Sequence, residues 1–206
     1  MPYERINETD PLVMLADLID NDTIGAIQTG LEALEGTAFE GTAEAGVTLT
    51  QSVPTRQFVF SFTDLEVTIG NTTGISFGSV QLGTLPQGQL RVDSVMVDVA
   101  FGLENVGNVT PVDGDDNGDF ALGTVATAAG ALTSTEANIL ASTAVAYDTD
   151  IAVENVTPKT VDLQAAVPDL FLNITVDDAD VGDGADDVVE LTGSVTVTVT
   201  NWGFVA

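Results

Sequence analysis

The chain has 206 residues, 44% of them hydrophobic, which suffices for one domain with a real core, or for one domain and an arm. Its 32 acidic residues stand against four basic ones, so the formal net charge is −28, and the clustered Lys and Arg that nucleic acids or anionic membrane surfaces attract are missing. The chain has no Cys and no His, which excludes disulfides, thiolate metal sites and the usual general base.

The acidic excess has two interpretations. It can simply keep the chain soluble through mutual repulsion. It can also indicate life in concentrated salt, because at about 1 M salt the Debye length falls to about 3 Å and self-repulsion is screened. A single lysine, Lys159, in a chain of 206 residues favours a halophilic source. The start, MPYERINETDP, lacks the layout of a secretory signal, and no apolar stretch is long enough to span a membrane, so we expect a soluble chain.

Two short amphipathic α-helices are predicted at the N-terminal end. Asp10-Pro11 fits an N-cap followed by proline at the first helical position, and Asp22 fits the N-cap of a second helix that ends at Gly36. These stripes either pack against the chain's own sheet or belong to an arm, residues 1–36, that docks on a neighbouring subunit. The apolar positions at helical spacing, which are the candidate contact residues, are Leu12, Leu15, Leu18, Ile24, Ile27 and Leu31.

Residues 37–206 are predicted as one antiparallel β-sandwich or jelly roll, because apolar and polar residues alternate with a period of two and no helical crossovers separate the runs. No strand is predicted in an Ala-rich segment, 128–146. The predicted strands are 47–50, 57–69, 75–82, 89–103, 120–127, 150–156, 161–167, 170–176 and 188–202. The fold class is therefore mainly β, preceded by two short helices.

Two of these strands require an irregularity. In 57–69 the apolar phase switches at Thr63-Asp64, where a bulge would keep Phe62 and Leu65 on the same face. The run 188–202 would span about 50 Å at about 3.3 Å per residue, several times a usual strand. Gly193 is therefore the expected bend or bulge, where the strand leaves one sheet and joins another.

Two acidic stretches are candidates for a structural cation. The first resembles part of a calcium loop, but Thr124 stands where a bidentate Glu belongs and no helices flank it, so it is no EF-hand. Its oxygens can still hold Ca²⁺ or another hard cation, and the alternative is a solvated turn. A bound cation would stabilise an ordered conformation of the stretch, because it would neutralise carboxylates that repel one another. The candidate ligands are Asp113, Asp115, Asn117 and Asp119 in the first stretch and Asp177, Asp180 and Asp183 in the second.

Catalysis is not predicted. The P-loop, the dinucleotide fingerprint and the G-x-S-x-G elbow are all absent. With 32 acidic residues, carboxylate pairs are inevitable and carry no information, and one Trp and two Tyr provide few platforms for sugar rings. We expect no enzyme and no cofactor, apart from a structural cation in the acidic stretches.

Residues 75–202 carry phrases that resemble a known group of proteins. The phrases are a Leu-Pro-x-Gly turn at 85–88, D-F-A-L-G-T at 119–124, T-S-T-E-A-N-I-L-A-S-T at 133–143 and L-N-I-T-V-D-D-A-D-V at 172–181. In these the chain resembles virion structural proteins of tailed viruses, and it is similar to capsid decoration or minor head proteins of marine phages and their haloarchaeal counterparts. The resemblance implies a β-sandwich or jelly roll that sits on a capsid, often as a trimer, and it implies no binding residues.

The leading hypothesis is a structural protein that decorates or cements the capsid of a halophilic tailed virus. Its expected partners are the major capsid protein and further copies of itself, with a homotrimer favoured, and neither nucleic acid nor membrane. Its expected place is the capsid surface, outside the genome compartment. The alternatives are a cell-surface, S-layer-type or adhesion β-sandwich module, a turret or tail component, and a jelly-roll capsid protein of a tail-less virus. A surface module would carry glycans at its Asn-x-Thr sequons, Asn7, Asn21, Asn71, Asn108, Asn155 and Asn173.

Overall fold

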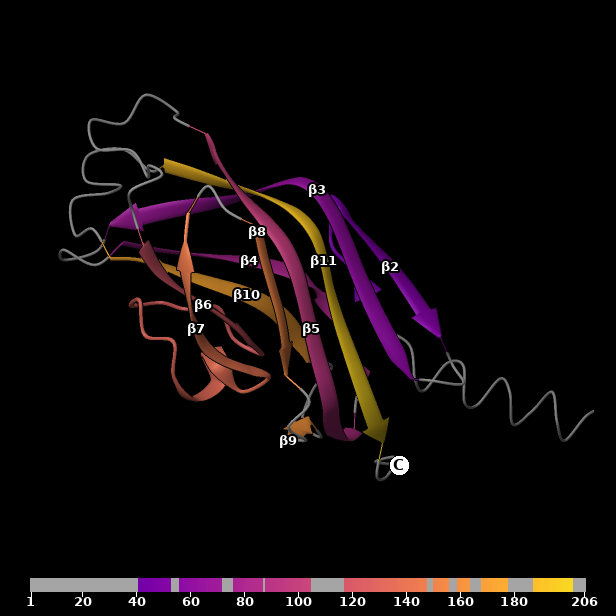
Figure 1. Cartoon of the computed structure of the whole chain (residues 1–206). Helices are drawn as coiled ribbons and strands as arrows, with labels where there is room; N and C mark the ends of the chain where they lie inside the picture. Colours follow the sequence, from indigo (N-terminus) through magenta and orange to yellow (C-terminus); the bar gives the residue numbers. More distant parts are fainter. Residues whose placement is uncertain are drawn as a thin grey trace, which may run out of the picture. The chain divides into compact units, whose positions relative to one another are not determined.

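The computed structural model describes residues 41–52, 56–71, 76–86, 88–104, 117–147, 150–155, 159–163, 168–177 and 187–201. The two predicted helices, the arm 1–36 and the boundary after it lie outside the described residues. The described part contains one short 3-10 turn, η1 (Ser134–Ala137), and eleven strands. Figure 1 shows how the strands are arranged. These are β1 (Thr42–Ala43), β2 (Val47–Ser52), β3 (Gln57–Asn71), β4 (Ser76–Thr84), β5 (Gly88–Glu104), β6 (Asn117–Gly123), β7 (Leu140–Ala146), β8 (Asp150–Asn155), β9 (Lys159–Leu163), β10 (Asp169–Val176) and β11 (Asp187–Asn201).

The strands form one continuous sheet in the order β7-β6-β10-β4-β3-β11-β5-β8, with β1 beside β4, β2 beside β3 and β9 beside β5. The half β7-β6-β10-β4 with β1 is called sheet A below, and the half β3-β11-β5-β8 with β2 and β9 is called sheet B. β3 joins the halves, because Gly70 and Asn71 pair with Phe77 and Ser76 of β4. The pairings between described strands are antiparallel. The prediction of a mainly β, antiparallel chain is confirmed.

The core lies between the facing surfaces of sheets A and B. Phe101 of β5 lies against Phe120 of β6, with ring centroids 6.0 Å apart, and Tyr147 packs edge-on to Phe101. Gly78 of β4 lies so close to sheet B that a Cβ there would be 2.8 Å from Ile69 Cδ1. The continuous sheet therefore curls so that the apolar face of sheet A packs against the apolar face of sheet B, as in folds of the β-sandwich type.

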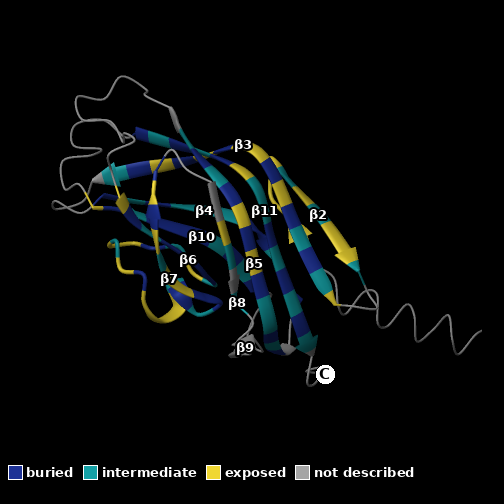
Figure 2. Ribbon diagram, viewed as in Figure 1, coloured by how far each residue is buried: buried dark blue, intermediate teal, exposed yellow. Residues whose placement is uncertain are grey.

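A period of two selects which side chains enter this core. Along β11 the inward residues are at most 1% exposed, and the threonines between them are more exposed. Figure 2 shows this alternation of buried and accessible positions along β3, β5 and β11. Burying each Val or Leu contributes about 1.5–3 kcal/mol, so these long strands contribute much of the stability of the domain. The inward residues of β11 are Val189, Leu191, Val195, Val197 and Val199.

The predicted bulge at Thr63-Asp64 is confirmed. Leu191 pairs with Leu65 and Gly193 with Phe62, so β3 uses three steps where β11 uses two. Gly193, with φ 149°, lies at the same shift, which confirms it as a bulge position. The expectation that the strand changes sheets at Gly193 is wrong. β11 pairs with β3 and β5 on both sides of this residue, and the bulge accommodates the extra residue locally without ending the pairing.

The Ala-rich piece contains η1 and β7, which the sequence did not assign because alanine has low β-propensity. The segment 124–139 packs on the outer face of sheet A through the amide of Asn173, which is fully buried. Asn173 Oδ1 accepts hydrogen bonds from the backbone N–H of Thr127 (2.9 Å) and the hydroxyl of Ser79 (2.7 Å). Its Nδ2 donates to the carbonyls of Val125 (3.0 Å) and Glu136 (2.8 Å). One side chain therefore fixes a connection that lacks regular structure.

Candidate functional site

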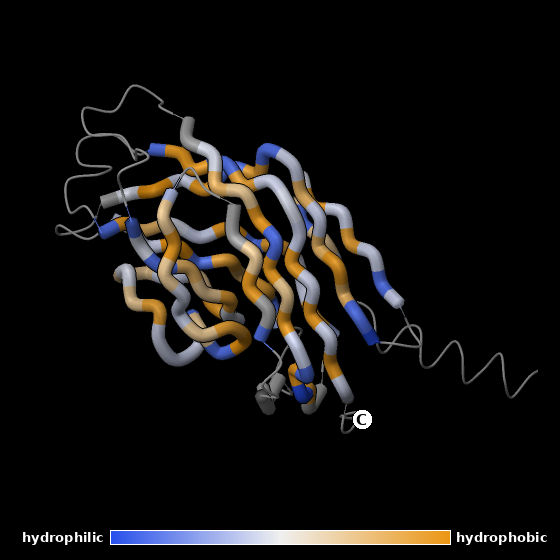
Figure 3. The backbone as a smooth tube through the Cα atoms, in the orientation of Figure 1, coloured by the Kyte–Doolittle hydropathy of each residue, from blue (hydrophilic) through white to orange (hydrophobic). Residues whose placement is uncertain are grey.

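The outer face of sheet B is covered by short, mostly hydroxyl-bearing side chains. They are the residues between the buried ones, because successive side chains of a strand point to opposite faces. Antiparallel register aligns them in rows across β3, β11 and β5, and Figure 3 shows the pale, weakly polar positions that alternate with apolar ones. Three of the rows are Ser61-Ser194-Asp98, Val59-Thr196-Met96 and Gln57-Thr198-Ser94, which β2 extends with Thr48, Thr50 and Ser52. A further row, Glu66-Glu190-Gly102, is acidic.

Met96 is the exposed large apolar side chain of this face. It lies on β5 and is 48% exposed, between Thr196 on β11 and the β8 strand. Threonine and serine lose little side-chain entropy when they are covered, and an exposed methionine adapts to irregular contact surfaces. The face is therefore suited to contact with another broad surface.

A shallow, open depression of about 520 Å³ lies on the same face beside the bulge. A Cβ on Gly193 would lie 2.1 Å from the carbonyl oxygen of Asp98, so the glycine keeps β11 close to β5 here. The bulge is tied across the strands, since the Asp64 N–H donates to Thr192 Oγ1 (3.0 Å). The lining residues, Gly46, Thr48, Ser61, Phe62, Thr63, Thr192 and Gly193, offer hydrogen bonds and contain no titratable side chain.

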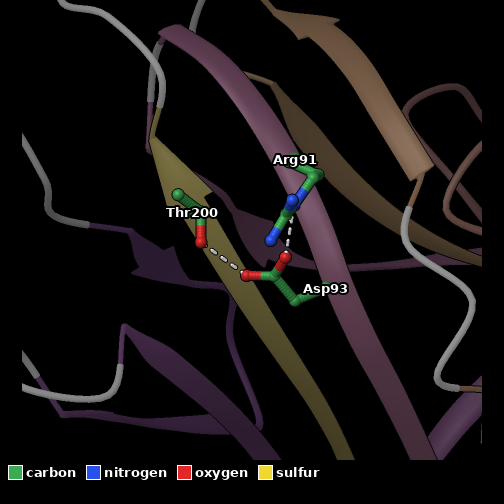
Figure 4. A network of polar contacts seen from close by, with 3 residues as sticks. All are labelled: Arg91, Asp93 and Thr200. Atoms are coloured by element: carbon green, nitrogen blue, oxygen red, sulfur yellow. Dashed lines mark hydrogen bonds and ion pairs between the residues drawn. The ribbon is translucent and has the colours of Figure 1, made fainter.

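A polar network marks a second bulge, between β11 and β5. Thr198 pairs with Ser94 and Val199 with Val92, so Asp93 is the extra residue. Figure 4 shows Asp93 bridging two strands: Arg91 Nε donates to one carboxylate oxygen (2.5 Å), and the Thr200 hydroxyl donates to the other (2.6 Å). The Arg91 and Asp93 side chains are 38% and 25% exposed, so water screens the pair and its contribution stays near or below about 1 kcal/mol. The hydrogen bond between Thr200 and Asp93 therefore links β11 to β5 at this bulge.

The first group of predicted cation ligands is only partly described. Asp113 and Asp115 lie outside the described residues. Asn117 and Asp119 are at the start of β6, which corrects the expectation that they belong to a loop. The reason is the Gly118 between them, which pairs with Val145 of β7 on one side and Val176 of β10 on the other. Pairing on both edges holds this part of the acidic stretch in the sheet.

The second group lies partly beside the first. Asp177 follows β10 directly, and its N–H donates to the carbonyl oxygen of Asn117 (2.7 Å), whereas Asp180 and Asp183 lie outside the described residues. The two acidic stretches thus join the sheet at adjacent strands, which the sequence could not indicate. The described residues contain no group of three or more acidic side chains that could hold a metal, so a structural cation stays a prediction.

The candidate contact residues of the arm, Leu12, Leu15, Leu18, Ile24, Ile27 and Leu31, lie outside the described residues. In the part that the structure describes, no helix has the length and apolar character of a membrane span. The alternation in 188–202 puts threonines on one face of the strand, but the sequence does not indicate the depression, because Thr48, Ser61 and Thr192 come together only through strand register.

Comparison with known proteins gives little. No family model matches the chain, and no curated protein matches it. Among solved structures, it is similar to a variant of a family 29 carbohydrate-binding module, with 11% sequence identity and a TM-score of 0.25. The match covers 80% of this chain and 77% of that one. A similarity this distant carries no argument about ligand or function.

Proposed function

We propose that this chain is a non-enzymatic structural protein of a virion. It decorates or cements the capsid of a halophilic tailed virus, as a jelly-roll-like sandwich that binds the major capsid protein. The observation that supports this most is the broad outer face of sheet B, with its rows of short side chains across β2, β3, β11 and β5. Such a face makes many small contacts and holds no centre for chemistry among its aligned residues.

Charge supports the use of this face for docking. The chain carries a formal charge of −28, so most of its surface repels other acidic proteins. The three rows named above hold one carboxylate, Asp98, among hydroxyl, amide and apolar side chains, whereas Glu66 and Glu190 lie in a further row of the same face. A partner can therefore cover the rows at low desolvation cost, with Met96 as an apolar anchor.

The proposals of a docking arm and of a homotrimer are based on the sequence. The stripes at 12–18 and 24–31 would fasten neighbouring subunits, and the resemblance to decoration proteins favours a homotrimer on the outside of the shell. We place the protein on the capsid surface, outside the genome compartment, with no contact to nucleic acid or membrane.

The test uses purified particles of the source virus and a binding assay on them. Mass spectrometry should find the chain in the particles, unglycosylated, and electron microscopy should locate it on the head. In the full chain, the pair Met96→Glu and Thr196→Glu should lower capsid occupancy by about tenfold or more, because it buries charge against the shell. Thr135→Glu, at an exposed residue of η1, is the matched control and should bind as wild type does.

Two results would refute the proposal. Glycosylated native protein on a cell surface would establish the alternative of an S-layer-type or adhesion module. Density for the chain on the tail or a turret would establish those positions instead. Wild-type occupancy by the double variant would exclude the sheet B face, and the arm would then carry the contact.

A further inference from the structure

Asn117, the first residue of β6, is followed by Gly118, and this is the one Asn-Gly dipeptide of the chain. An asparagine loses its side-chain amide most readily before glycine, because no Cβ hinders the approach of the next backbone nitrogen to the side chain. Every other asparagine of the chain precedes a residue that has a Cβ. Asn117 is exposed, so water reaches its side chain.

The fold requires the glycine of this dipeptide. β6 lies between β7 and β10 in the sheet (Figure 1). A Cβ on Gly118 would overlap the backbone carbonyl oxygen of Thr175 in β10, and it would lie 3.1 Å from the hydroxyl oxygen of Tyr147. A larger residue would therefore push β6 away from β10, so the close packing of these strands maintains a reactive dipeptide at this position.

The pairing of β6 keeps the reaction from starting. Gly118 pairs with Val145 of β7 on one side and with Val176 of β10 on the other. The Asp177 N–H donates to the Asn117 carbonyl oxygen, and hydrogen-bonded positions alternate along an antiparallel pair, so the Gly118 N–H points toward β7. Ring closure needs this nitrogen without its proton, and it needs the ψ angle of Asn117 to leave the extended range near about +135°.

The opening that would release this nitrogen is local. Residues at the ends of strands open at a lower free-energy cost than those in the middle, and Asn117 begins its strand. The contacts that hold this end come from sheet A. The Tyr147 hydroxyl donates to the Thr175 carbonyl oxygen (2.7 Å), and the Asp119 N–H donates to Thr175 Oγ1 (3.3 Å). Opening of the strand end therefore depends on these contacts and leaves sheet B intact.

We propose that Asn117 is a site of spontaneous modification that the pairing of β6 keeps closed. When the strand end opens, the Gly118 backbone nitrogen gives its proton to hydroxide and attacks Cγ of Asn117. The new C–N bond forms, the Cγ–Nδ2 bond breaks, and ammonia leaves after taking a proton from water. Water then opens the cyclic imide at either carbonyl carbon, which leaves aspartate or isoaspartate. The net reaction exchanges ammonia for water, and it does not rest on the proposed role in a virion.

The product weakens the strand end that protected the asparagine. A new carboxylate at Asn117 would join Asp119 and Asp177 at the end of sheet A where the acidic stretches meet, in a chain of charge −28. Isoaspartate also adds a methylene carbon to the backbone, which puts the pairing of β6 with its neighbours out of register. A modified chain should therefore open more readily at this place than an unmodified one.

Peptide mapping by mass spectrometry tests the proposal on the purified full chain, kept at mildly alkaline pH in high salt with and without urea. Digestion with pepsin in acid stops the reaction first. The Asn117 peptide should gain the mass that replacement of an amide by an acid adds, at least about tenfold more slowly in the folded chain. Amide hydrogen exchange of Gly118 should slow by the same factor, because it needs the same opening. Peptides with Asn138 and Asn173 are the internal control and should stay unmodified, and Asn117→Gln should abolish the signal.

Two variants test whether the opening is local. Tyr147→Phe removes the hydrogen bond to Thr175 and should speed modification of the folded chain by about tenfold. Gly193→Ala, in sheet B, is the matched control: it destabilises the fold elsewhere and should be modified at the wild-type rate while it stays folded. The proposal is overturned by equal rates in folded and unfolded wild type, by an Asn117 that stays unmodified in urea, or by Gly193→Ala acting as strongly as Tyr147→Phe.

Discussion

At the scale of single residues, Asn173 shows how much one buried amide organises. It makes four hydrogen bonds, to Thr127, Ser79, Val125 and Glu136, and holds the segment 124–139 on sheet A. Leu132 and Ala137 of this segment form a small buried apolar cluster with Ala121 of β6. A polar group with all its hydrogen bonds made is cheap to bury, but each partner left alone costs about 1–3 kcal/mol. The sequon at Asn173 is therefore closed to a glycan in the folded chain.

Replacing Asn173 with Ala should lower the free energy of unfolding by about 3 kcal/mol, because buried donors and acceptors lose their partner. Urea unfolding followed by circular dichroism measures this. Thr135→Ala, at an exposed position, serves as the control and should change the free energy by less than about 0.5 kcal/mol. A loss below about 1 kcal/mol for Asn173→Ala would show that the network contributes little.

Gly193 and Gly102 form a matched pair on the neighbouring strands β11 and β5. Gly193→Ala should destabilise by about 2–4 kcal/mol, because φ is 149° and a Cβ would lie 2.1 Å from the Asp98 carbonyl oxygen. At Gly102 the nearest atom would be 3.6 Å away, so Gly102→Ala should stay within about 0.5 kcal/mol of wild type. Thermal unfolding of both variants measures the two destabilisations. Equal destabilisation by Gly193→Ala and Gly102→Ala would contradict the role assigned to the bulge.

At the scale of elements, the bulge in β3 keeps two apolar runs in one core. Phe58, Phe60 and Phe62 precede it, and Leu65, Val67 and Ile69 follow it, all of them buried. Without the extra residue the two runs would point to opposite faces. Asp64 occupies the bulge with φ 50°, a left-handed conformation that an aspartate tolerates and a glycine favours.

Two variants distinguish the effect of the extra residue in β3 from the effect of the Asp64 side chain. Asp64→Gly keeps the bulge and should stabilise the chain by up to about 1 kcal/mol, after the loss of the weak Thr192 contact is included. Deleting Asp64 turns three phenylalanines outward, at about 1.5–3 kcal/mol each, which approaches the total stability of a domain. The deleted chain should give a poorly dispersed NMR spectrum. A well-folded deletion variant would show that β3 can shift its register without the bulge.

At the scale of the whole molecule, charge sets the conditions for folding. Arg91 pairs with Asp93, but the chain has four basic residues for 32 acidic ones, so most of its carboxylates have no basic partner available. Their mutual repulsion opposes the compact state and is screened by salt. Concentrated salt, as in the proposed halophilic source, would screen this repulsion.

The free energy of unfolding should rise steeply from about 0.1 to about 1 M NaCl and level off above that, where the Debye length is about 3 Å. Scanning calorimetry across NaCl and KCl measures this, and the two salts should act alike. The prediction of a bound cation is tested separately, by adding about 1 mM CaCl₂ at low salt. A rise in the free energy of unfolding that the double variant Asp113→Asn with Asp180→Asn no longer shows would establish a cation site in the acidic stretches. Stability that is independent of salt would contradict the halophilic interpretation.

The sequence by itself determined the mainly β class and most strand positions, because period-two alternation is a local property of each strand. It also located the bulge between β3 and β11 from both sides, at Thr63-Asp64 and at Gly193, since a change of phase and a glycine in a long strand are visible in the order of residues. It did not reveal β7, whose alanines carry a weak local signal.

Only the tertiary structure decided which strands are neighbours. Register aligned the hydroxyl rows of sheet B, formed the depression around Thr192, and brought Asn117 beside Asp177 across sixty residues of chain. It also placed Gly118 of β6 against the Thr175 carbonyl of β10. Pairing between distant strands depends on the packing of the whole sheet, which no local pattern of residues specifies.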